Sequence, residues 1–268
     1  MPATTSQGRS VASKVLAILE VFEALGLPLN LTQISAATGL PISTTHRLAR
    51  ELVDWGALDR DANGRYYVGL RLWEVAQNGG GQLRHTVRPF LQDLFSLTQE
   101  TSHLAIRQGH EALYIDRVYS SKRVPRASRV GGRLPLHATA VGKVLLAYED
   151  TWVRDAYIGR ALESPTTRTH VTPSRLVEEL ATIRDKGYAT TLEEARLGAC
   201  SIAVPVMGEE GRAKASIGLV MFSTQATKMT RHLPVLTGVA HRIEAAVSRY
   251  PVGYLTDRGD RSQGTSML

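Results

Sequence analysis

Three short helical segments, each ended by a glycine, precede a hairpin, and this order constrains the fold more than any other feature of the sequence. Apolar side chains recur at helical spacing over residues 10–25, and Gly26 ends that pattern. A second segment ends at Gly39 and a third at Gly56, in keeping with the preference for glycine just after a helix. An Asp-Ala-Asn-Gly turn over 61–64 then joins two short strands. Two helices joined by a tight glycine-containing turn and followed by a hairpin predict a winged helix-turn-helix.

The helix after Gly39 carries a polar, basic face that suits the major groove of DNA. Small side chains in its first turn allow close approach to base edges, and Arg47 can donate two hydrogen bonds to guanine. His46 and Arg50 suit phosphates, and Arg65, just after the hairpin turn, can reach the backbone or the minor groove. In the preceding helix Thr32 is the expected N-cap. The predicted DNA-binding residues are Thr32, Gln33, Ser43, Thr44, Thr45, His46, Arg47, Arg50 and Arg65. The alternative is that the helix-turn-helix is only a packing module.

The net charge of +7 and the pI near 9.7 are compatible with a polyanionic partner, but the charge lies elsewhere. Residues 1–71 hold 7 Lys/Arg and 6 Asp/Glu, a balance of only +1. The longest basic stretch is 117–133, with six basic residues and no acid. Bulk charge therefore does not identify the DNA-binding segment, and the prediction depends on where single arginines stand.

Glycines 79–81 interrupt a helical pattern and predict a joint between two domains, because each costs about 1 kcal/mol in a helix relative to alanine. A helix resumes at His85, and the remainder mixes strands and helices, including a strand over 124–130 and a closing helix over 233–250. The predicted class is α+β. The predicted parts are a disordered tail (1–9), a winged helix-turn-helix (10–69), a linker helix with the glycine joint (70–83), a second domain (84–250) and a flexible tail (251–268).

Several kinds of chemistry lack their signature. The Gly-Lys pair before residue 144 lacks the first glycine and the final Ser/Thr of a phosphate-binding loop. The eight histidines show no metal-ligand spacing, and we expect neither a metal nor a cofactor. The single cysteine, Cys200, sits in an apolar strand and is expected to pack in the core, and His137 is expected to pack or cap a turn. With no membrane span and no signal-peptide pattern, we expect a reduced, cytoplasmic protein. An enzyme using His137, Glu193 or Cys200 is the alternative function.

Five segments, in this order, resemble the IclR-type bacterial transcriptional regulators. They are SVASKVLAILEVFEA, LNLTQISAATGLPISTTHRLARELVDWGAL, GRYYVGLRLWEVA, RLPLHATAVGKVLLA and GYATTLEEARLGACSIAVPV, and the resemblance covers about residues 10–249. It implies a C-terminal effector-binding domain related to GAF and PAS folds, and a non-enzymatic repressor or activator of catabolic operons. It also implies homodimers formed through the N-terminal domains, often paired into homotetramers. The implied partners are double-stranded operator DNA and a small organic acid, with no membrane.

The same resemblance implies which residues line the effector pocket. They are Arg123, Arg126, Leu134, Ala140, Val141, Thr191, Glu193, Ala199, Ser201, Met221 and Ser223. Relatives often carry cysteine where Ser201 stands and arginine where Cys200 stands, so neither a cysteine-linked effector nor that arginine contact is expected. Arg123 and Arg126 depart from the apolar residues of several relatives and could pair bidentately with a carboxylate. We therefore expect an anionic effector, a carboxylate, with aromatic acids included. Equally open is that these arginines are solvated or hold a subunit interface.

Overall fold

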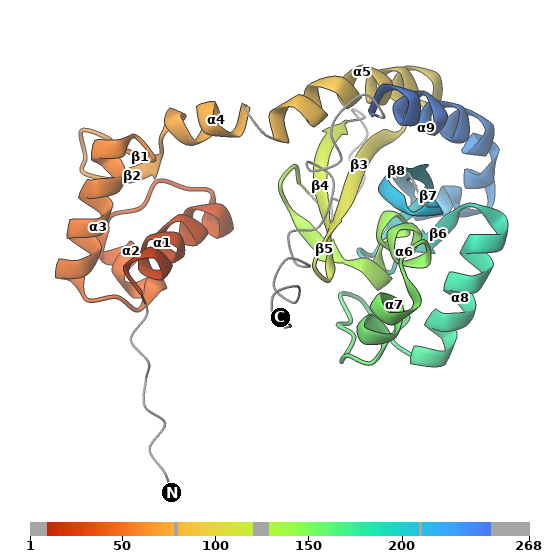
Figure 1. The fold of residues 1–268 in the computed structure, drawn as a ribbon, viewed down its shortest axis with the longest axis horizontal. Helices are drawn as coiled ribbons and strands as arrows, with labels where there is room; N and C mark the ends of the chain where they lie inside the picture. The colour runs from red at the N-terminus through yellow and green to blue at the C-terminus, as the bar shows by residue number, and fades with distance from the viewer. Residues whose placement is uncertain (1–9, 78–79, 120–128, 209–210, 248–268) are drawn as a thin grey trace, which may run out of the picture. The chain divides into compact units, whose positions relative to one another are not determined.

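Residues 10–77, 80–119, 129–208 and 211–247 are described by the structure, a computed structural model. The chain divides into two compact units, residues 1–81 and 82–268 (Figure 1). The boundary falls within the predicted joint, 78–82. No helix in the described residues is both long enough and apolar enough to span a bilayer.

The first unit is a bundle of three helices with a small hairpin. Helices α1 (Val11–Leu25), α2 (Leu31–Thr38) and α3 (Ile42–Trp55) precede strands β1 (Leu58–Arg60) and β2 (Tyr66–Val68) and helix α4 (Leu70–Gln77). The two strands pair antiparallel, with Leu58 opposite Val68. The core is apolar and includes Ile18, Phe22, Leu29, Ile34, Leu48, Ala49, Leu52, Leu58 and Tyr66. The predicted winged helix-turn-helix is confirmed.

Glycine ends each of the three helices, but the start of α2 differs from the prediction. Gly26, Gly39 and Gly56 all adopt the left-handed conformation, which costs glycine no steric strain. The cap of α2 is Asn30, whose side-chain oxygen accepts from the Gln33 N–H at 2.9 Å while the Gln33 side chain accepts from the Asn30 N–H at 2.9 Å. The prediction of a Thr32 cap is therefore wrong, because this reciprocal capping box satisfies two backbone donors and begins the helix two residues earlier.

The second unit is built on one antiparallel sheet of six strands. Their spatial order is β5-β4-β3-β8-β7-β6. The strands are β3 (Thr101–Gln108), β4 (Glu111–Val118), β5 (Arg133–Pro135), β6 (Ala189–Leu192), β7 (Ala199–Met207) and β8 (Ala213–Phe222). The helices are α5 (Gly80–Thr98), α6 (Ala140–Ala147), α7 (Thr151–Ile158), α8 (Pro173–Lys186) and α9 (Leu233–Val247), with 3-10 segments η1 (Leu136–Ala138) and η3 (Ser223–His232).

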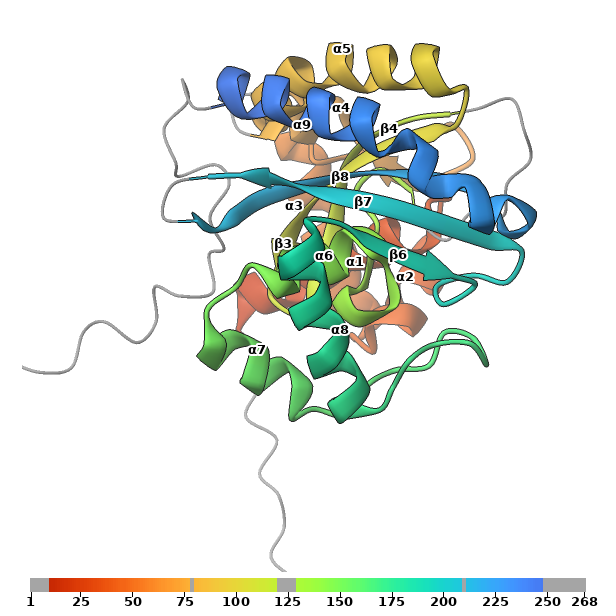
Figure 2. The same ribbon diagram turned by 90° about the vertical axis from the view of Figure 1, so that its right-hand side faces the viewer.

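Helices cover both faces of this sheet. Figure 2 shows α5 and α9 on one face, and α6 and α8 on the other. The first face holds a core that includes Val87, Leu91 and Leu94 of α5, and Leu236, Val239, Ala240, Ile243 and Val247 of α9, the predicted closing helix, are buried there. The second core surrounds α6, every residue of which is buried. A short helix buried all round has no solvent face, so its one charged residue, Lys143, needs partners inside the protein.

Some predicted elements differ in extent. The helix expected to resume at His85 already begins at Gly80, so two of the three joint glycines belong to α5, where helix geometry tolerates glycine at a cost. The strand predicted over 124–130 lies largely outside the described residues, and the strand found in this region is β5. The prediction did not include β6, α7, η1 or η3.

Two helical glycines of the second unit provide a stability test. A Cβ at Gly142 would overlap the Leu136 carbonyl oxygen and lie 2.6 Å from Thr139 Oγ1, whereas a Cβ at Gly238 would meet nothing within 4 Å. We expect Gly142→Ala to lower the free energy of unfolding by about 1–3 kcal/mol, as in overpacked cores. Gly238→Ala should raise it by about 0.5–1 kcal/mol through helix propensity. Chemical denaturation measures both, and equal changes in the two variants would contradict the packing argument.

Candidate functional site

The exposed face of α3 carries most of the predicted DNA-binding side chains. Ser43, His46, Arg47 and Arg50 are exposed and Thr44 is half-buried, while Thr32, Gln33 and Arg65 are exposed on α2 and after the hairpin turn. Thr45 is fully buried and its hydroxyl donates to the Pro41 carbonyl oxygen at 3.1 Å. The prediction of a Thr45 contact is wrong, because helical spacing places it with Leu48 and Ala49 in the core.

Each cationic side chain on this surface has an acidic neighbour four residues away. Arg47 Nη1 lies 2.7 Å from Glu51 Oε1, Arg50 Nε lies 3.9 Å from Asp54 Oδ2, and Arg65 Nε lies 2.9 Å from Asp61 Oδ2. The backbone N–H of Arg65 also bonds Asp61 and lowers the pKa of that carboxyl. Exposed helix pairs contribute only about 0.3–0.5 kcal/mol, so a phosphate or a base can displace them.

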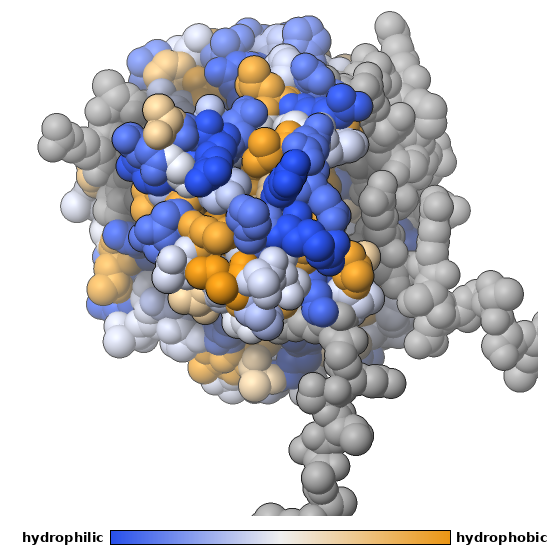
Figure 3. Space-filling view, turned by 90° about the vertical axis from the view of Figure 1, so that its left-hand side faces the viewer, coloured by the Kyte–Doolittle hydropathy of each residue, from blue (hydrophilic) through white to orange (hydrophobic). Residues whose placement is uncertain are grey.

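The surface of the first unit also exposes large apolar side chains. In Figure 3, hydrophobic residues lie among hydrophilic ones over one face of this unit. On α4 the side chains of Leu70, Trp73 and Val75 are 74%, 61% and 54% exposed. A helix that leaves such residues in water has an apolar surface available for a partner.

A cavity in the second unit opens between the sheet and the start of α6; we call it the sheet cavity. Its lining residues come from β3 to β8, η1–α6 and the loop after β6: His103, Tyr114, Arg117, Leu134, Thr139, Ala140, Val141, Thr191, Glu194, Ala195, Arg196, Ala199, Cys200, Ser201 and Val220. The volume open to water-sized molecules is about 40 Å³. That space holds a few waters at most, so the structure describes a closed form that a larger ligand must open.

Two buried basic side chains face this cavity from neighbouring strands. Arg117 is 4% exposed, and His103 is 2% exposed with no hydrogen-bond partner for Nδ1 among the described residues. Burial, helped by the charge of Arg117, lowers the pKa of His103 to about 3, so its imidazole is neutral near pH 7. The cavity therefore offers one buried guanidinium cation and one neutral imidazole whose Nδ1 lacks a partner among the described residues.

A β-bulge aims Arg117 into the cavity. Leu104 pairs with Asp116 but Ala105 pairs with Tyr114, so Ile115 is an extra residue in β4. Strict alternation would place residues 114 and 117 on opposite faces, whereas both line the cavity. A bulge re-aims side chains in this way. No pattern in the sequence marks its position.

The opposite wall is polar and contains hydroxyl groups. Thr191 Oγ1 and Ser201 Oγ lie 2.5 Å apart on adjacent strands. Cys200 points the other way, and its S–H donates to the Phe222 carbonyl oxygen at 3.1 Å. Burial raises the pKa of Cys200 to about 11, so the sulfur stays protonated at neutral pH. This agrees with the predicted core role of Cys200, because the thiolate is the nucleophilic form.

Behind this wall lies a buried network of charges centred on Lys143. Its ammonium donates to Glu179 Oε1 at 2.7 Å and to Glu194 Oε1 and Oε2 at 2.9 and 2.8 Å. The Lys143 side chain is fully buried and that of Glu194 is 3% exposed. Burial raises the pKa of Glu194, and the Lys143 charge opposes that rise. This network fixes the loop that carries Glu194, one lining residue of the cavity.

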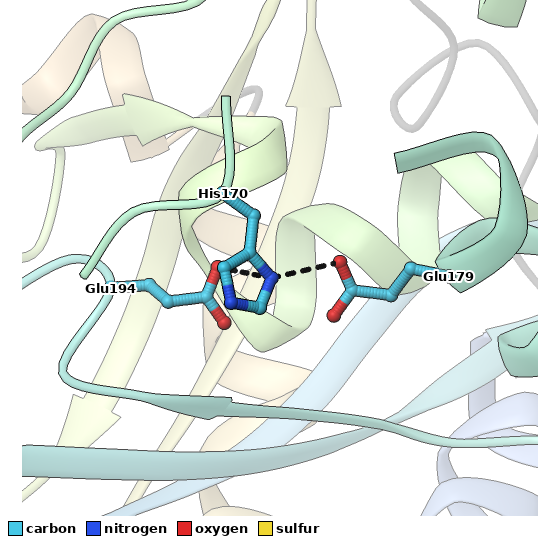
Figure 4. Close-up of side chains that lie close together, drawn as sticks. All are labelled: His170, Glu179 and Glu194. Carbon is cyan, nitrogen blue, oxygen red and sulfur yellow. Dashed lines mark hydrogen bonds and ion pairs between the residues drawn. The ribbon is translucent and has the colours of Figure 1, made fainter. Parts of the chain in front are cut away.

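The network includes a histidine in a metal-like arrangement. His170 Nδ1 lies 3.4 Å from Glu179 Oε2 and 3.6 Å from Glu194 Oε2 (Figure 4). Three ligand atoms within 4.8 Å of one another could surround a cation. Here the Lys143 ammonium already bridges the two carboxylates, and a divalent ion would have to displace it or share the site with a buried positive charge. The donor set therefore fits an ion-pair network better than a metal centre.

Several of the predicted pocket residues lie around the sheet cavity. Six line the sheet cavity: Leu134, Ala140, Val141, Thr191, Ala199 and Ser201. Arg123 and Arg126 lie outside the described residues. The lining residues that the prediction missed are His103, Tyr114, Arg117, Thr139, Glu194, Ala195, Arg196, Cys200 and Val220.

Three predicted pocket residues do not line the cavity. Met221 is fully buried in the core on the α9 face of β8, so the lining residue of that strand is Val220. Ser223 lies beyond β8, and its N–H donates to the Gly198 carbonyl oxygen. Glu193 adopts a left-handed φ of 61° and its carboxylate accepts from the Gly198 N–H at 2.8 Å. Glu193 therefore holds the two ends of the loop after β6 together, and Glu194 lines the sheet cavity in its place.

Two larger hollows lie elsewhere in the described part of the second unit. One, of about 340 Å³, is lined mainly by apolar residues of α5, α9 and the ends of β7 and β8. The other, of about 350 Å³, lies beside η1, where His137 Nδ1 and Nε2 lie 2.7 Å from the Tyr157 hydroxyl and the Glu163 carbonyl oxygen. Because both ring nitrogens of His137 have partners and burial lowers its pKa, it packs the turn, as expected.

Family profiles match most of the chain. The profile described as the C-terminal region of the bacterial transcriptional regulator IclR matches residues 79–249, and that of the IclR helix-turn-helix domain matches residues 11–62.

Individual relatives agree with the profiles. The HTH-type transcriptional regulator XynR of Escherichia coli is 35% identical over 214 residues, 77% of this chain and 83% of that protein. The Pca operon regulatory protein of Acinetobacter baylyi is 29% identical, with 86% of each chain covered. Among solved structures, an IclR homologue from Microbacterium hydrocarbonoxydans complexed with 4-hydroxybenzoate is 29% identical with a TM-score of 0.84, covering 90% of this chain and 100% of that one.

Proposed function

The chain belongs to the IclR family of bacterial transcriptional regulators, and from this premise we propose that it binds operator DNA through α3 and senses a small carboxylate in the sheet cavity. The family consists of regulators rather than enzymes, which sets aside the alternative of catalysis in the second unit. Acting on bacterial operator DNA would place the protein in the cytoplasm.

The DNA-binding half of the proposal rests on the exposed α3 face. Arg47 would read a guanine in the major groove, with Ser43 and Thr44 allowing close approach, while Arg50 and Arg65 would contact phosphates. We further propose that two copies read two half-sites. The exposed apolar side chains of α4 are available for such pairing within the first units. A dimer of such dimers through the second units is compatible with this arrangement.

The effector half rests on one observation, the buried guanidinium of Arg117 in the sheet cavity. A carboxylate would pair with it bidentately in a site from which water is largely excluded, where charge-assisted bonds are strongest. The unpartnered nitrogen of His103 can add one neutral hydrogen bond. Arg117, whose side chain faces the cavity, is a better candidate for this contact than the predicted Arg123 and Arg126, which the structure does not describe.

An aromatic ring is the proposed body of the effector. Tyr114 and Val141 line the cavity together with alanines and Leu134, and these side chains suit a flat apolar ring. The Thr191 and Ser201 hydroxyls stand on the wall opposite Arg117 and could bond a second polar substituent. The Microbacterium relative, complexed with 4-hydroxybenzoate, supports a hydroxylated aromatic acid as the first class to test.

Fluorescence anisotropy on the intergenic DNA upstream of the protein's own gene tests the DNA half. We expect Arg47→Ala to lose about 1–3 kcal/mol of preference for this DNA over random DNA, because one bidentate base contact disappears. Arg50→Ala should instead weaken binding to both DNAs alike and reduce the slope against log salt by about one. If Arg47→Ala keeps the full preference, α3 is not the reading helix.

Calorimetric titration of the full-length protein with 4-hydroxybenzoate, benzoate and an uncharged analogue, 4-hydroxybenzamide, tests the effector half. The proposal expects heat with the carboxylates and none with the amide, because only the carboxylates can pair with Arg117. Equal binding of the amide would show that the negative charge of the carboxylate does not contribute to recognition.

A further inference from the structure

Asp116 lies between the wall of the sheet cavity and α5, and it contacts both. Its carboxylate is fully buried, and Oδ1 accepts the backbone N–H of Arg117 at 2.8 Å. On its other side, Arg88 Nη1 lies 3.1 Å from both oxygens, and Arg84 Nε lies 3.2 Å from Oδ1. One carboxylate thus joins the residue proposed to hold the effector to two residues of α5.

The position of α5 in the chain makes this link relevant to regulation. It is the first helix of the second unit, and residues 78–79 alone separate it from α4 of the first unit. Buried Val87, Leu91 and Leu94 hold the middle of α5 on the sheet. Arg84 and Arg88 lie in the N-terminal half of the helix, and their side chains are 49% and 45% exposed. Asp116 is therefore their buried anchor in the half of α5 that is closest in sequence to the DNA-binding unit.

The strand that carries Asp116 is interrupted next to it. The bulge at Ile115 leaves that residue without a cross-strand partner, and a disrupted ladder resists displacement less than a continuous one. The closed cavity of about 40 Å³ cannot accept an aromatic ring without movement of its wall. Arg117 belongs to that wall and directly follows Asp116, so a shift of one backbone position moves the other.

We infer that Asp116 is a positioning residue that transmits occupancy of the sheet cavity to α5. A carboxylate held by Arg117 shifts β4 at the bulge, and Asp116 carries that shift to Arg84 and Arg88. This inference rests on the proposed effector site. The chain supplies a matched control on the same helix, because Arg242 Nη2 of α9 lies 2.8 Å from Asp93 Oδ2 of α5, and neither residue lines the cavity.

Hydrogen–deuterium exchange of the full-length protein, with and without saturating 4-hydroxybenzoate, tests the inference. In the wild type we expect the ligand to change exchange both in the cavity strands and in the first turns of α5. In Asp116→Asn the change in the strands should persist while the change in α5 is lost. Asp93→Asn should keep both changes. Affinity for the ligand, measured by calorimetry, should stay within about threefold in both variants, a difference below 1 kcal/mol.

Each other outcome contradicts a specific step. Retention of the α5 response in Asp116→Asn, or its absence in a wild type that binds the ligand, overturns the inference and leaves the proposed effector site intact. Absence of binding to the wild type overturns the proposed aromatic-carboxylate site, and the inference falls with it. If Asp116→Asn does not fold, the double variant Arg84→Gln/Arg88→Gln decides, since both side chains are half-exposed and the same loss of the α5 response is expected.

Discussion

Replacing Lys143 with methionine is expected to destabilise the second unit by about 3–5 kcal/mol, because it leaves the buried Glu194 carboxylate without its cation. Methionine retains most of the volume of the lysine stem, so the loss reports charge rather than an empty space. Thermal and chemical unfolding measure the effect. Lys228→Met, which removes an exposed lysine from the same unit, should change stability by less than about 0.5 kcal/mol.

Low pH and a second substitution should each restore stability to the Lys143→Met variant. Without Lys143, the main charge that opposes the burial-driven rise in the pKa of Glu194 is gone, and only the weaker opposing effect of His170, 3.6 Å from Glu194 Oε2, remains among the described residues. The folded form then binds a proton more tightly than the unfolded chain. The loss of stability caused by Lys143→Met is therefore largest above the pKa of Glu194 in the folded protein. It disappears at pH values below the pKa of Glu194 in the unfolded chain. The gap to the wild type should narrow as pH falls, and Lys143→Met/Glu194→Gln should recover much of the loss at neutral pH. A gap independent of pH would mean that packing, not charge, causes it.

Replacing Arg117 with methionine is expected to weaken binding of 4-hydroxybenzoate by about 2–5 kcal/mol, the usual cost of removing one partner of a desolvated charge pair. This corresponds to a loss of roughly 30-fold to several thousandfold in affinity. Calorimetric titration measures it, after circular dichroism has shown that the variant folds. Arg117→Lys should retain part of the affinity, because an ammonium keeps the charge but cannot form the planar two-bond contact.

A second arginine of the same cavity is the control. Arg196 also lines the sheet cavity but is exposed, so water screens its charge and Arg196→Met should cost less than about 1 kcal/mol. Equal losses in the two variants would indicate general electrostatic attraction rather than a contact at Arg117. His103, with a pKa near 3, should add no pH dependence to binding around neutrality.

The first unit could be predicted closely because its signals are local. The apolar spacing, the glycines after each helix and the Asp-Ala-Asn-Gly turn act within a few residues. The true cap is also a local signal: Asn30 and Gln33, three residues apart in the sequence, form the capping box that begins α2 in place of Thr32. Thr45 shows the limit of residue type as a guide, since a small polar side chain fits a groove-facing surface and a helix core alike.

The predicted residues that line the sheet cavity came from the family resemblance. Leu134, Ala140 and Val141 stand around one turn, and Thr191, Ala199 and Ser201 lie on the adjacent strands β6 and β7. Arg117 and His103 were missed because strand pairing and a bulge bring them together, and neither leaves a pattern in the chain. Glu194 lines the cavity where Glu193 was predicted, because Glu193 adopts a left-handed backbone conformation that is uncommon for a residue other than glycine. The sequence around Lys143 does not show that this residue is buried, because the burial results from α6 being covered on every side in the fold.

If α3 contacts DNA as proposed, the acidic residues beside its arginines affect how the protein searches the chromosome. Glu51 and Asp54 stand one helical turn beyond Arg47 and Arg50 and compete with phosphate for the same guanidinium groups. Random DNA offers the same phosphates, but its base edges seldom match the reading side chains, so the exchange gains little. At the operator, matching base edges add to the gain. On this proposal the chain would keep its dwell time on unrelated sequence short and leave more copies free to sample new sites, although its overall charge is positive.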